Sequence, residues 1–447
     1  MDRDNTITIQ EYESLTRAKD LGIKGFHTMP GPAFDALETL LLKNQQGDAQ
    51  ASDFLSLSIR RGEKVISAKN YVGLIVLQDG TNIEILPKVA GATKEQTRQI
   101  FRDMLSTMRD LPFKSFQKAH LQSDKLSLLE VFIAAFLSET GALIKRGLKH
   151  GYVEHAGNER FLKGRLDFDQ QIRQNLVRKE RFFIEYDEFE INRPENRLIK
   201  SALQFVLRKS RDANNLRDCR RYLQVLEEVE PSADPASDLT RCTGSRIMRE
   251  YDIVLQWCRI LLMNRSITMF KGTEVAIALL YPMEQLFESY VAAKLRRALK
   301  APYRITAQDT GYYLFDAPKK QFALRPDIVI HRPDERCVVM DTKWKVLSPY
   351  QTNYGISQSD MYQMYAYHKK YKPKEVVLIY PYDPSIGEAD KVLEFKAIEG
   401  DDVCVKAIFF DLLNVDKSVE WILQAYKTSR KDNNNSEKEI SHEFRFS

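Results

Sequence analysis

Apolar and polar residues follow three successive patterns along the chain. In residues 54–89, apolar runs alternate with polar turns, and Asp79-Gly80 between LIVL and IEIL is a strong hairpin signal. Helical periodicity flanks this stretch at residues 34–44 and 94–111. We therefore expect residues 1–120 to form an N-terminal β-rich module that carries flanking helices.

The pattern becomes mostly helical from about residue 121 to 270. Residues 128–152 and 195–210 have helical periodicity, whereas GRLDFDQQI (164–172) between them is strand-like. Residues 196–221 contain eight Lys or Arg against two Asp. Such a surface can face phosphates, but we favour an ordinary solvated helix face.

The third pattern, residues 271–428, predicts a mixed sheet with helices on its faces. An amphipathic helix at 281–300 precedes a strand and turn at 303–315, and a hairpin follows at 325–345. A helix at 360–371 and a buried strand at 375–383 complete the order. The fold class is thus a multidomain α+β or α/β protein, and the polar tail 429–447 is expected to be disordered.

Composition narrows the function classes. The net charge of +5 over 447 residues permits a nucleic-acid partner without arguing for one. The five cysteines are scattered without a CxxC pair, which disfavours a disulfide framework or zinc site and favours a reducing cytoplasm. The N-terminus has no secretory pattern, and the longest apolar run, 128–137, is too short for a membrane span. No GxxxxGK[ST] phosphate loop occurs, so an NTP-driven process would need a motor on another chain.

The hairpin at 325–345 carries unexpected charges. Asp327 adjoins its first apolar run, and Asp341 and Lys343 end the second run on one strand face. Two neighbouring carboxylates repel unless a cation lies between them, and oxygen ligands without His or Cys suit Mg²⁺ or Mn²⁺. A nearby lysine can polarise water or stabilise phosphate charge, which suits phosphodiester hydrolysis. The plain alternative is a surface hairpin with a salt bridge.

These residues, RPD followed by MDTKWK, resemble the PD-(D/E)xK nuclease motif. The resemblance implies that Asp327 and Asp341 hold the metal and that Lys343 is the catalytic lysine. Glu288 in LFESYV stands where many such nucleases have a supporting acidic residue, although it could be an ordinary exposed glutamate. Gln363 and Tyr367 resemble the QxxxY element of RecB-like nucleases, although the tyrosines could form a core stripe.

Further motifs extend the resemblance over residues 60–415. NYVGLIVLQDGTNIEILPKV, GYVEHAGNERFLKGRLDF, EYDEFEINRPENRLIKSAL, LFESYV, the hairpin and SDMYQMYAY occur in the order that is typical of the McrC family. That resemblance implies the nuclease subunit of a McrBC modification-dependent restriction system. It also implies a McrB-like AAA+ GTPase ring as partner, bound through the N-terminal part, and double-stranded DNA as substrate. Two cuts in a duplex further suggest dimerisation of nuclease domains.

Two rival functions remain open. One is a stand-alone RecB-like repair or recombination nuclease, which would cut DNA without a partner or NTP. The other is a catalytically inert nuclease-fold activator of an AAA+ ring. For GRLDF and ENRLIKSAL, contact with a partner or DNA is one interpretation. We favour the other, in which Gly164 makes a turn and Glu195 and Asn196 cap or bracket a helix.

Overall fold

The computed structural model describes residues 6–17, 22–43, 53–108, 127–242, 249–263, 275–331, 336–387, 392–397 and 403–427. The chain forms two compact units, and each combines two separate segments: Met1–Ile85 with Asp110–Leu280, and Leu86–Arg109 with Tyr281–Ser447. The predicted module boundaries near residues 120 and 270 remain predictions. The predicted disordered tail, 429–447, lies outside the described residues.

A four-stranded sheet of the first unit contains the predicted hairpin. Its order is β1 (Thr6–Gln10), β7 (Asn82–Leu86), β6 (Tyr71–Leu77) and β11 (Val275–Pro282). β6 and β7 pair antiparallel, and the Asp79 carboxylate accepts a hydrogen bond from the Thr81 N–H at 2.8 Å, which confirms the turn. Gly73 permits close approach of β6 and β11, because a Cβ there would lie 1.9 Å from the Leu279 carbonyl oxygen.

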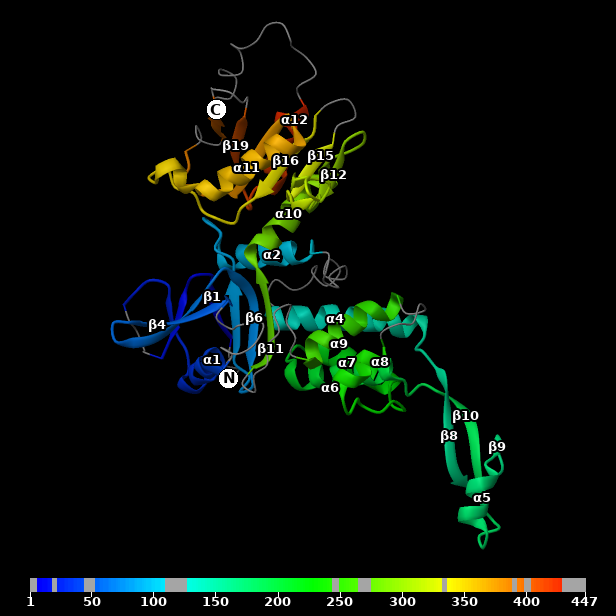
Figure 1. The fold of residues 1–447 in the computed structure, drawn as a ribbon. Coiled ribbons are helices and arrows are strands. Elements are labelled where there is room, and N and C mark those ends of the chain that lie inside the picture. Colours follow the sequence, from blue (N-terminus) through cyan, green and yellow to red (C-terminus); the bar gives the residue numbers. More distant parts are fainter. Residues whose placement is uncertain are drawn as a thin grey trace. The chain divides into compact units, whose positions relative to one another are not determined.

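A second four-stranded sheet completes the β-rich part of this unit. Its order is β3 (Phe26–Thr28), β2 (Ser14–Thr16), β5 (Glu63–Ala68) and β4 (Leu55–Arg60). The helix α1 (Gly31–Lys43) contacts β4 and begins one turn before the predicted start at residue 34. The β-rich character predicted for this stretch is confirmed (Figure 1).

Helices make up most of the remainder of the first unit. They are α4 (Leu128–Arg146), α6 (Pro194–Lys209), α7 (Ala213–Val225), α8 (Pro235–Arg241) and α9 (Arg249–Met263). Glu130 of α4 is buried, and its carboxylate accepts hydrogen bonds from Ser210 Oγ at 2.7 Å, Arg211 N at 2.6 Å and Asn215 Nδ2 at 2.7 Å. These bonds satisfy the buried charge and tie α4 to the start of α7.

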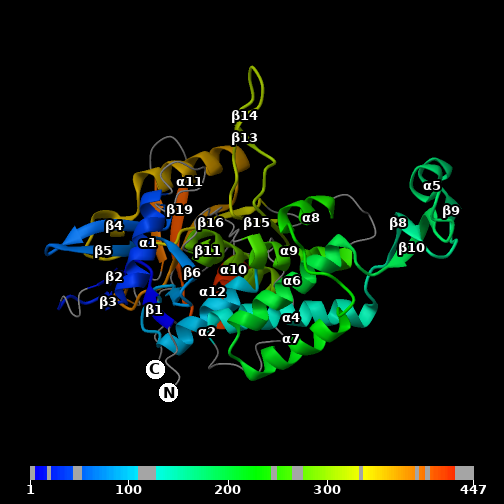
Figure 2. The same ribbon diagram turned by 90° about the horizontal axis from the view of Figure 1, so that it is seen from below.

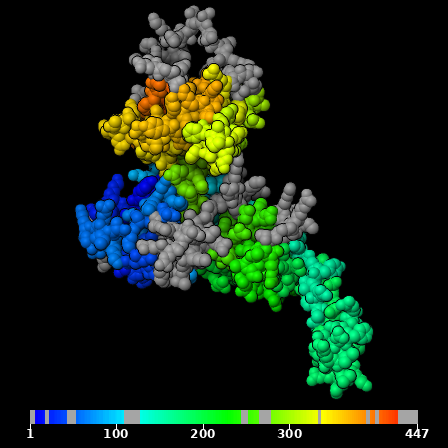
Figure 3. All heavy atoms as spheres, in the orientation of Figure 1, coloured from blue at the N-terminus to red at the C-terminus, as the bar shows by residue number. Residues whose placement is uncertain are grey.

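A three-stranded arm interrupts these helices between α4 and α6. It consists of β8 (Gly151–Glu159), β10 (Phe182–Glu190), the short β9 (Arg165–Leu166) and α5 (Phe168–Asn175). Figures 1 and 2 show the arm extending from the helices of its own unit, and Figure 3 shows its atoms standing out in the same way. The sequence pattern did not reveal β8 and β10, because apolar side chains such as Tyr152 and Phe189 lie on exposed positions.

The strand predicted at 164–172 is wrong beyond Leu166. Asp167 caps α5 instead, since its side chain accepts a hydrogen bond from the Gln170 N–H at 3.1 Å. Gly164 is required for the turn, because it has φ +71° and a Cβ there would lie 2.3 Å from the Glu185 carbonyl oxygen. The prediction of a turn at Gly164 is therefore confirmed.

Asn196 does not cap α6, which begins at Pro194 after Arg193. Its side-chain amide donates to the Lys149 carbonyl at 2.9 Å and to the Ile191 carbonyl at 2.7 Å. These two residues stand just before β8 and just after β10, so Asn196 holds together the two strand ends at the base of the arm.

The second unit contains a six-stranded mixed sheet. Its order is β12 (Arg304–Ala307), β15 (Ile328–His331), β16 (Val338–Thr342), β17 (Glu375–Pro381), β19 (Cys404–Phe410) and β18 (Val392–Lys396). β15 and β16 pair antiparallel, whereas β16–β17 and β17–β19 are parallel. The predicted mixed sheet is confirmed; residues 332–335 of the predicted hairpin turn lie outside the described residues. A small hairpin, β13 (Tyr313–Phe315) with β14 (Gln321–Ala323), is separate.

Helices cover both faces of this sheet. α11 (Gln358–Tyr371) packs on the face that carries Leu378 and Tyr380. On the other face, Phe287 and Tyr290 of α10 (Met283–Ala298) meet Phe410 edge to face. α12 (Val415–Lys427) and α2 (Lys94–Leu105) contact α10. α2 lies in the second unit, although the predicted first module extends to residue 120.

A 3₁₀ turn, η5 (Thr352–Gly355), precedes α11. The mixed α+β class is thus established in both units. All five cysteines are free thiols. Among the described residues, no helix has the length and apolar character needed to cross a membrane.

Candidate active site

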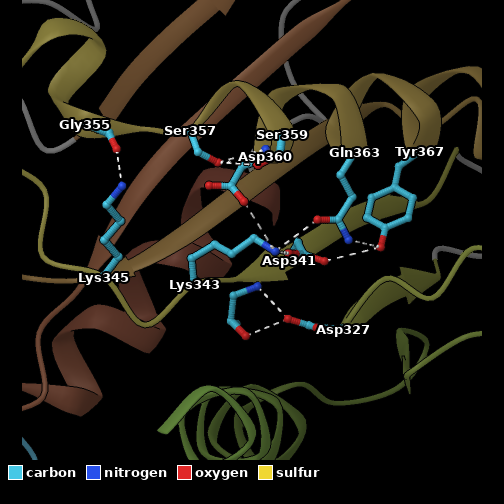
Figure 4. A network of polar contacts seen from close by, with 11 residues as sticks. Asp327, Asp341, Lys343, Lys345, Gly355, Ser357, Ser359, Asp360, Gln363 and Tyr367 are labelled. Atoms are coloured by element: carbon cyan, nitrogen blue, oxygen red, sulfur yellow. Dashed lines mark hydrogen bonds and ion pairs between the residues drawn. The ribbon is translucent and has the colours of Figure 1, made fainter. Parts of the chain in front are cut away.

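The charged residues of the predicted hairpin meet at one end of β15 and β16. In the antiparallel register Ile328 faces Met340, so the next pair brings Asp327 opposite Asp341. The N–H and the hydroxyl of Thr342 both donate to Asp327 Oδ2 at 2.7 Å (Figure 4). The predicted neighbourhood of Asp327 and Asp341 is therefore present.

Lys343 continues β16 and turns back to Asp341. Its Nζ lies 2.7 Å from Asp341 Oδ2 and 3.0 Å from Gln363 Oε1, to which it donates a hydrogen bond. Alternation along the strand places residues 341 and 343 on one face, as the sequence predicts. Two elements, β16 and α11, thus supply the groups that fix the ammonium.

Burial makes the two aspartates hard to ionise. The side chain of Asp341 is 2% exposed. Burial raises the pKa of Asp327 to about 6, with a further rise from the charge of Glu288 and an opposing effect of the Thr342 hydrogen bonds. Burial and the charge of Asp327 likewise raise the pKa of Asp341 to about 6, against the opposing effect of Lys343. For Lys343, burial opposes the charged form, but Asp341, Asp360 and Asp327 outweigh it and raise its pKa.

Gln363 and Tyr367 close a ring of hydrogen bonds with Asp341 and Lys343. Gln363 Nε2 donates to the Tyr367 hydroxyl at 2.8 Å, and this hydroxyl donates to Asp341 Oδ1 at 3.4 Å (Figure 4). Tyr367 is also buried in the core between α11 and the sheet, but Tyr362 and Tyr365 are exposed, so the alternative of a core stripe of tyrosines is wrong for these two. Burial and the charge of Asp341 raise the pKa of Tyr367, so the hydroxyl stays protonated.

Glu288 lies on α10, which packs against β16. It is half-buried, and its charge is second only to burial in raising the pKa of Asp327. The structure therefore groups Glu288 electrostatically with the hairpin carboxylates instead of leaving it as an isolated exposed glutamate.

Two contributors escaped the sequence reasoning. Asp360 Oδ1 lies 3.8 Å from Lys343 Nζ. The sequence feature that indicates Asp360 is its spacing, because it stands three residues before Gln363 and therefore on the same helix face. Thr342, between Asp341 and Lys343, was missed because strand alternation alone predicts that its side chain faces away from theirs, whereas its hydroxyl bonds to Asp327.

The donor set fits a hard divalent cation. Asp341 Oδ2 is buried, and among the described residues its polar partner is the Lys343 ammonium, at 2.7 Å. Asp327, Asp341 and Glu288 offer oxygen atoms without His or Cys, the ligand chemistry of Mg²⁺ or Mn²⁺. These residues could therefore hold such a cation, with other positions open to water or phosphate oxygens.

The described residues also contain a closer group of metal-ligand types, on the arm. Ligand atoms of His155, Glu188 and Glu190 lie within 4.8 Å of one another, closer together than the three carboxylates above. However, His155 Nε2 already lies 2.6 Å from Glu190 Oε1, and Lys163 Nζ lies 3.7 Å from Glu188 Oε2. A hydrogen bond and an ion pair therefore account for this group.

Comparison with solved structures places the fold in a known class. The refined half-complex from the tetradecameric assembly of Thermococcus gammatolerans McrB AAA+ hexamers with bound McrC matches with a TM-score of 0.69 and 22% identity, over 94% of this chain and 100% of that chain. At this identity the likeness shows the fold alone. The cryo-EM structure of the Thermococcus gammatolerans McrBC complex matches with a TM-score of 0.49 and 22% identity, over 66% of this chain and 88% of that chain. No curated protein matches the chain.

The family follows from the sequence itself. The model of the McrBC 5-methylcytosine restriction system component matches residues 66–381, which is well over half of the chain. The chain belongs to this family, and the resemblance to McrC stated from its motifs is confirmed.

Proposed function

We propose that the chain is the Mg²⁺-dependent DNA endonuclease subunit of a McrBC-type restriction system, with a PD-(D/E)xK nuclease fold in its second unit. The observation that carries this proposal is the group formed by Asp327, Asp341 and Lys343, in which a buried Asp341 oxygen lies 2.7 Å from the Lys343 ammonium beside a second carboxylate. A structural salt bridge on a surface hairpin would not require a buried and a half-buried carboxylate side by side, both with raised pKa values.

Each side chain has a definable task in phosphodiester hydrolysis. Asp327 and Asp341 would hold the cation, and Glu288 adds a third negative charge nearby. The bound cation supplies Lewis-acid activation of water and phosphate. Lys343 stabilises the negative charge that develops on the phosphate, or orients the attacking water. Gln363 fixes the lysine through its Oε1, and its own amide orientation is set by the Tyr367 hydroxyl.

The proposal includes a partner that supplies NTP hydrolysis. The chain carries no GxxxxGK[ST] phosphate loop. McrC of Thermococcus gammatolerans is bound to McrB AAA+ hexamers. We extend that association to this chain: it binds and stimulates a McrB-like AAA+ GTPase through its N-terminal part and cuts double-stranded DNA. Cutting both strands would bring two nuclease domains together.

DNA cleavage with Mg²⁺ tests the proposal, measured with and without the AAA+ partner and GTP. Cutting by the wild-type chain with partner and GTP, lost in Asp341→Ala and Lys343→Ala variants that keep their thermal stability, is the expected result. Retention of cutting by either variant would sink the site assignment. Robust cutting without partner or GTP would favour a stand-alone nuclease, and GTPase stimulation without cutting by wild type would leave ring activation as the role.

A further inference from the structure

Three oxygen atoms surround the Lys343 ammonium. They belong to Asp341 at 2.7 Å, Gln363 at 3.0 Å and Asp360 at 3.8 Å. Asp341 is on β16, whereas Gln363 and Asp360 are on α11. Lys343 is thus shared between a strand that carries the proposed metal ligands and a helix that does not.

The proposed function sets two cations in competition for one oxygen. Asp341 Oδ2 lies 2.7 Å from the Lys343 ammonium, which is its polar partner among the described residues. A divalent cation at Asp341 would lie close to the ammonium, and like charges at such a distance repel strongly in a buried site. When the cation binds, the lysine must therefore lose contact with Asp341 Oδ2 while staying close enough to act on the phosphate.

We propose that Asp360 is a positioning residue that receives the Lys343 ammonium when a divalent cation takes Asp341. This inference rests on the proposed function and concerns the lysine of that same site. Among the described residues, Asp360 is the second carboxylate within 4 Å of Lys343 Nζ. The Asp360 oxygen lies 1.1 Å farther from Lys343 Nζ than the Asp341 oxygen does (3.8 minus 2.7 Å). The flexible four-carbon side chain of Lys343 can cover this difference with a short movement.

The local structure of α11 suits Asp360 for this task. Its backbone N–H donates to the capping Ser357 hydroxyl at 3.1 Å, which fixes the residue in the first helical turn. The helix dipole favours a negative charge in this turn. Gln363 lies one turn further along the same face of α11. Its Oε1 keeps accepting a hydrogen bond from the Lys343 ammonium while the ammonium moves.

A double-mutant cycle tests the inference without DNA. Mg²⁺ binding to the full chain is measured by titration calorimetry for wild type, Asp360→Asn, Lys343→Ala and the double variant. Lys343→Ala should tighten Mg²⁺ binding because the competitor is gone. Asp360→Asn should weaken Mg²⁺ binding at least about threefold, because the lysine then stays on Asp341, and should have clearly less effect when Lys343 is absent.

The outcomes separate this inference from the proposed function. If wild type binds neither Mg²⁺ nor Mn²⁺, the proposed function fails and the inference with it. If wild type binds Mg²⁺ but Asp360→Asn has no effect, or has the same effect in both backgrounds, the inference alone fails, since Asp360 would then be inert or would act on the cation directly.

Cleavage kinetics with the AAA+ partner add a second readout. Asp360→Asn should lower kcat about tenfold with little change in KM for DNA, and Asp360→Glu should restore a large part of it. Asp316→Asn is the matched control. Asp316 forms an ion pair at 2.9 Å with Lys370, which lies on α11 like Asp360 but outside the site. Asp360→Asn kinetics equal to those of this control would also overturn the inference.

Discussion

Thr342 is bonded twice to Asp327: its N–H and its hydroxyl both donate to Asp327 Oδ2, each at 2.7 Å. These two hydrogen bonds fix the Asp327 carboxylate beside the strand that leads to Asp341 and Lys343. We expect Thr342→Val to lower Mg²⁺ affinity about tenfold, because groups that orient metal ligands have effects of this size. Thr342→Ser keeps the hydroxyl and should stay near wild type. Equal Mg²⁺ affinities for the Val and Ser variants, measured by calorimetry, would contradict this role.

The raised pKa values predict a pH-dependent effect of Mg²⁺ on stability. Asp327 and Asp341 have a pKa of about 6 in the folded chain, against about 3.9 when unfolded. Both carboxyl groups therefore bind protons more tightly in the folded chain than in the unfolded chain. Their contribution to the free energy of unfolding is fully present below pH ~4 and is lost as the pH rises through ~6. A cation offsets the loss only where the carboxylates are ionised. Mg²⁺ should raise the melting temperature at pH 8 and have little effect at pH 5.

Asp327→Asn provides the matching variant for this experiment. It removes the charge of the half-buried carboxylate beside Asp341, and the amide oxygen can still accept both Thr342 hydrogen bonds. Without Mg²⁺ at pH 8 the variant should have a higher melting temperature than wild type. Its free energy of unfolding should be larger by on the order of 1 kcal/mol. A melting temperature below wild type under these conditions would show that the ionised Asp327 stabilises the fold.

Gln363 is expected to act through Lys343. Gln363→Met preserves the length of the side chain but removes the oxygen that accepts from Lys343 Nζ at 3.0 Å. We expect kcat for DNA cleavage to fall about tenfold with KM unchanged, because the lysine loses its orientation. Gln358→Met is the control, since Gln358 lies on the same helix and donates to the exposed Tyr362 hydroxyl at 2.7 Å. A similar kcat for both variants would remove Gln363 from the site.

The sequence was most informative where the structure is local. Asp327, Asp341 and Lys343 were brought together by hairpin register and strand alternation, which depend on neighbouring residues alone. Asp360 was missed because its contact joins a helix to a strand 17 residues earlier (360 minus 343). The grouping of α2 with α10 depends on packing across about 180 residues, which no local pattern encodes. The arm was missed because its alternating apolar residues lie on exposed positions.

Glu130 predicts a stability effect away from the site. Its two carboxylate oxygens accept from backbone and side-chain donors at the start of α7, among them Arg211 N and Asn215 Nδ2. Glu130→Gln replaces one acceptor by a donor that faces other donors, so it should lower the free energy of unfolding by about 1–3 kcal/mol. Glu139→Gln on the same helix is the control. Thermal unfolding compares the two variants, and equal melting temperatures would contradict the importance of this network.

The last prediction concerns the base of the arm. Asn196 is fully buried; its amide donates to the Lys149 and Ile191 carbonyls, and its Oδ1 accepts from the Tyr251 hydroxyl at 2.9 Å. Asn196→Ala leaves both carbonyls and the hydroxyl without these partners, while the hydrogen bonds between β8 and β10 remain. Amide hydrogen exchange should therefore accelerate around residues 149–151 and 190–192 and stay unchanged along the middle of β8 and β10.

The exposed Asn214→Ala variant on α7 controls for the loss of an asparagine in the same unit. If Asn196→Ala accelerates exchange throughout the first unit, the residue supports the helices as a whole. If exchange at the arm base does not change, the two strand ends are held without it. Local acceleration at the base alone is the result that the geometry predicts, because the three bonds of the Asn196 side chain converge there.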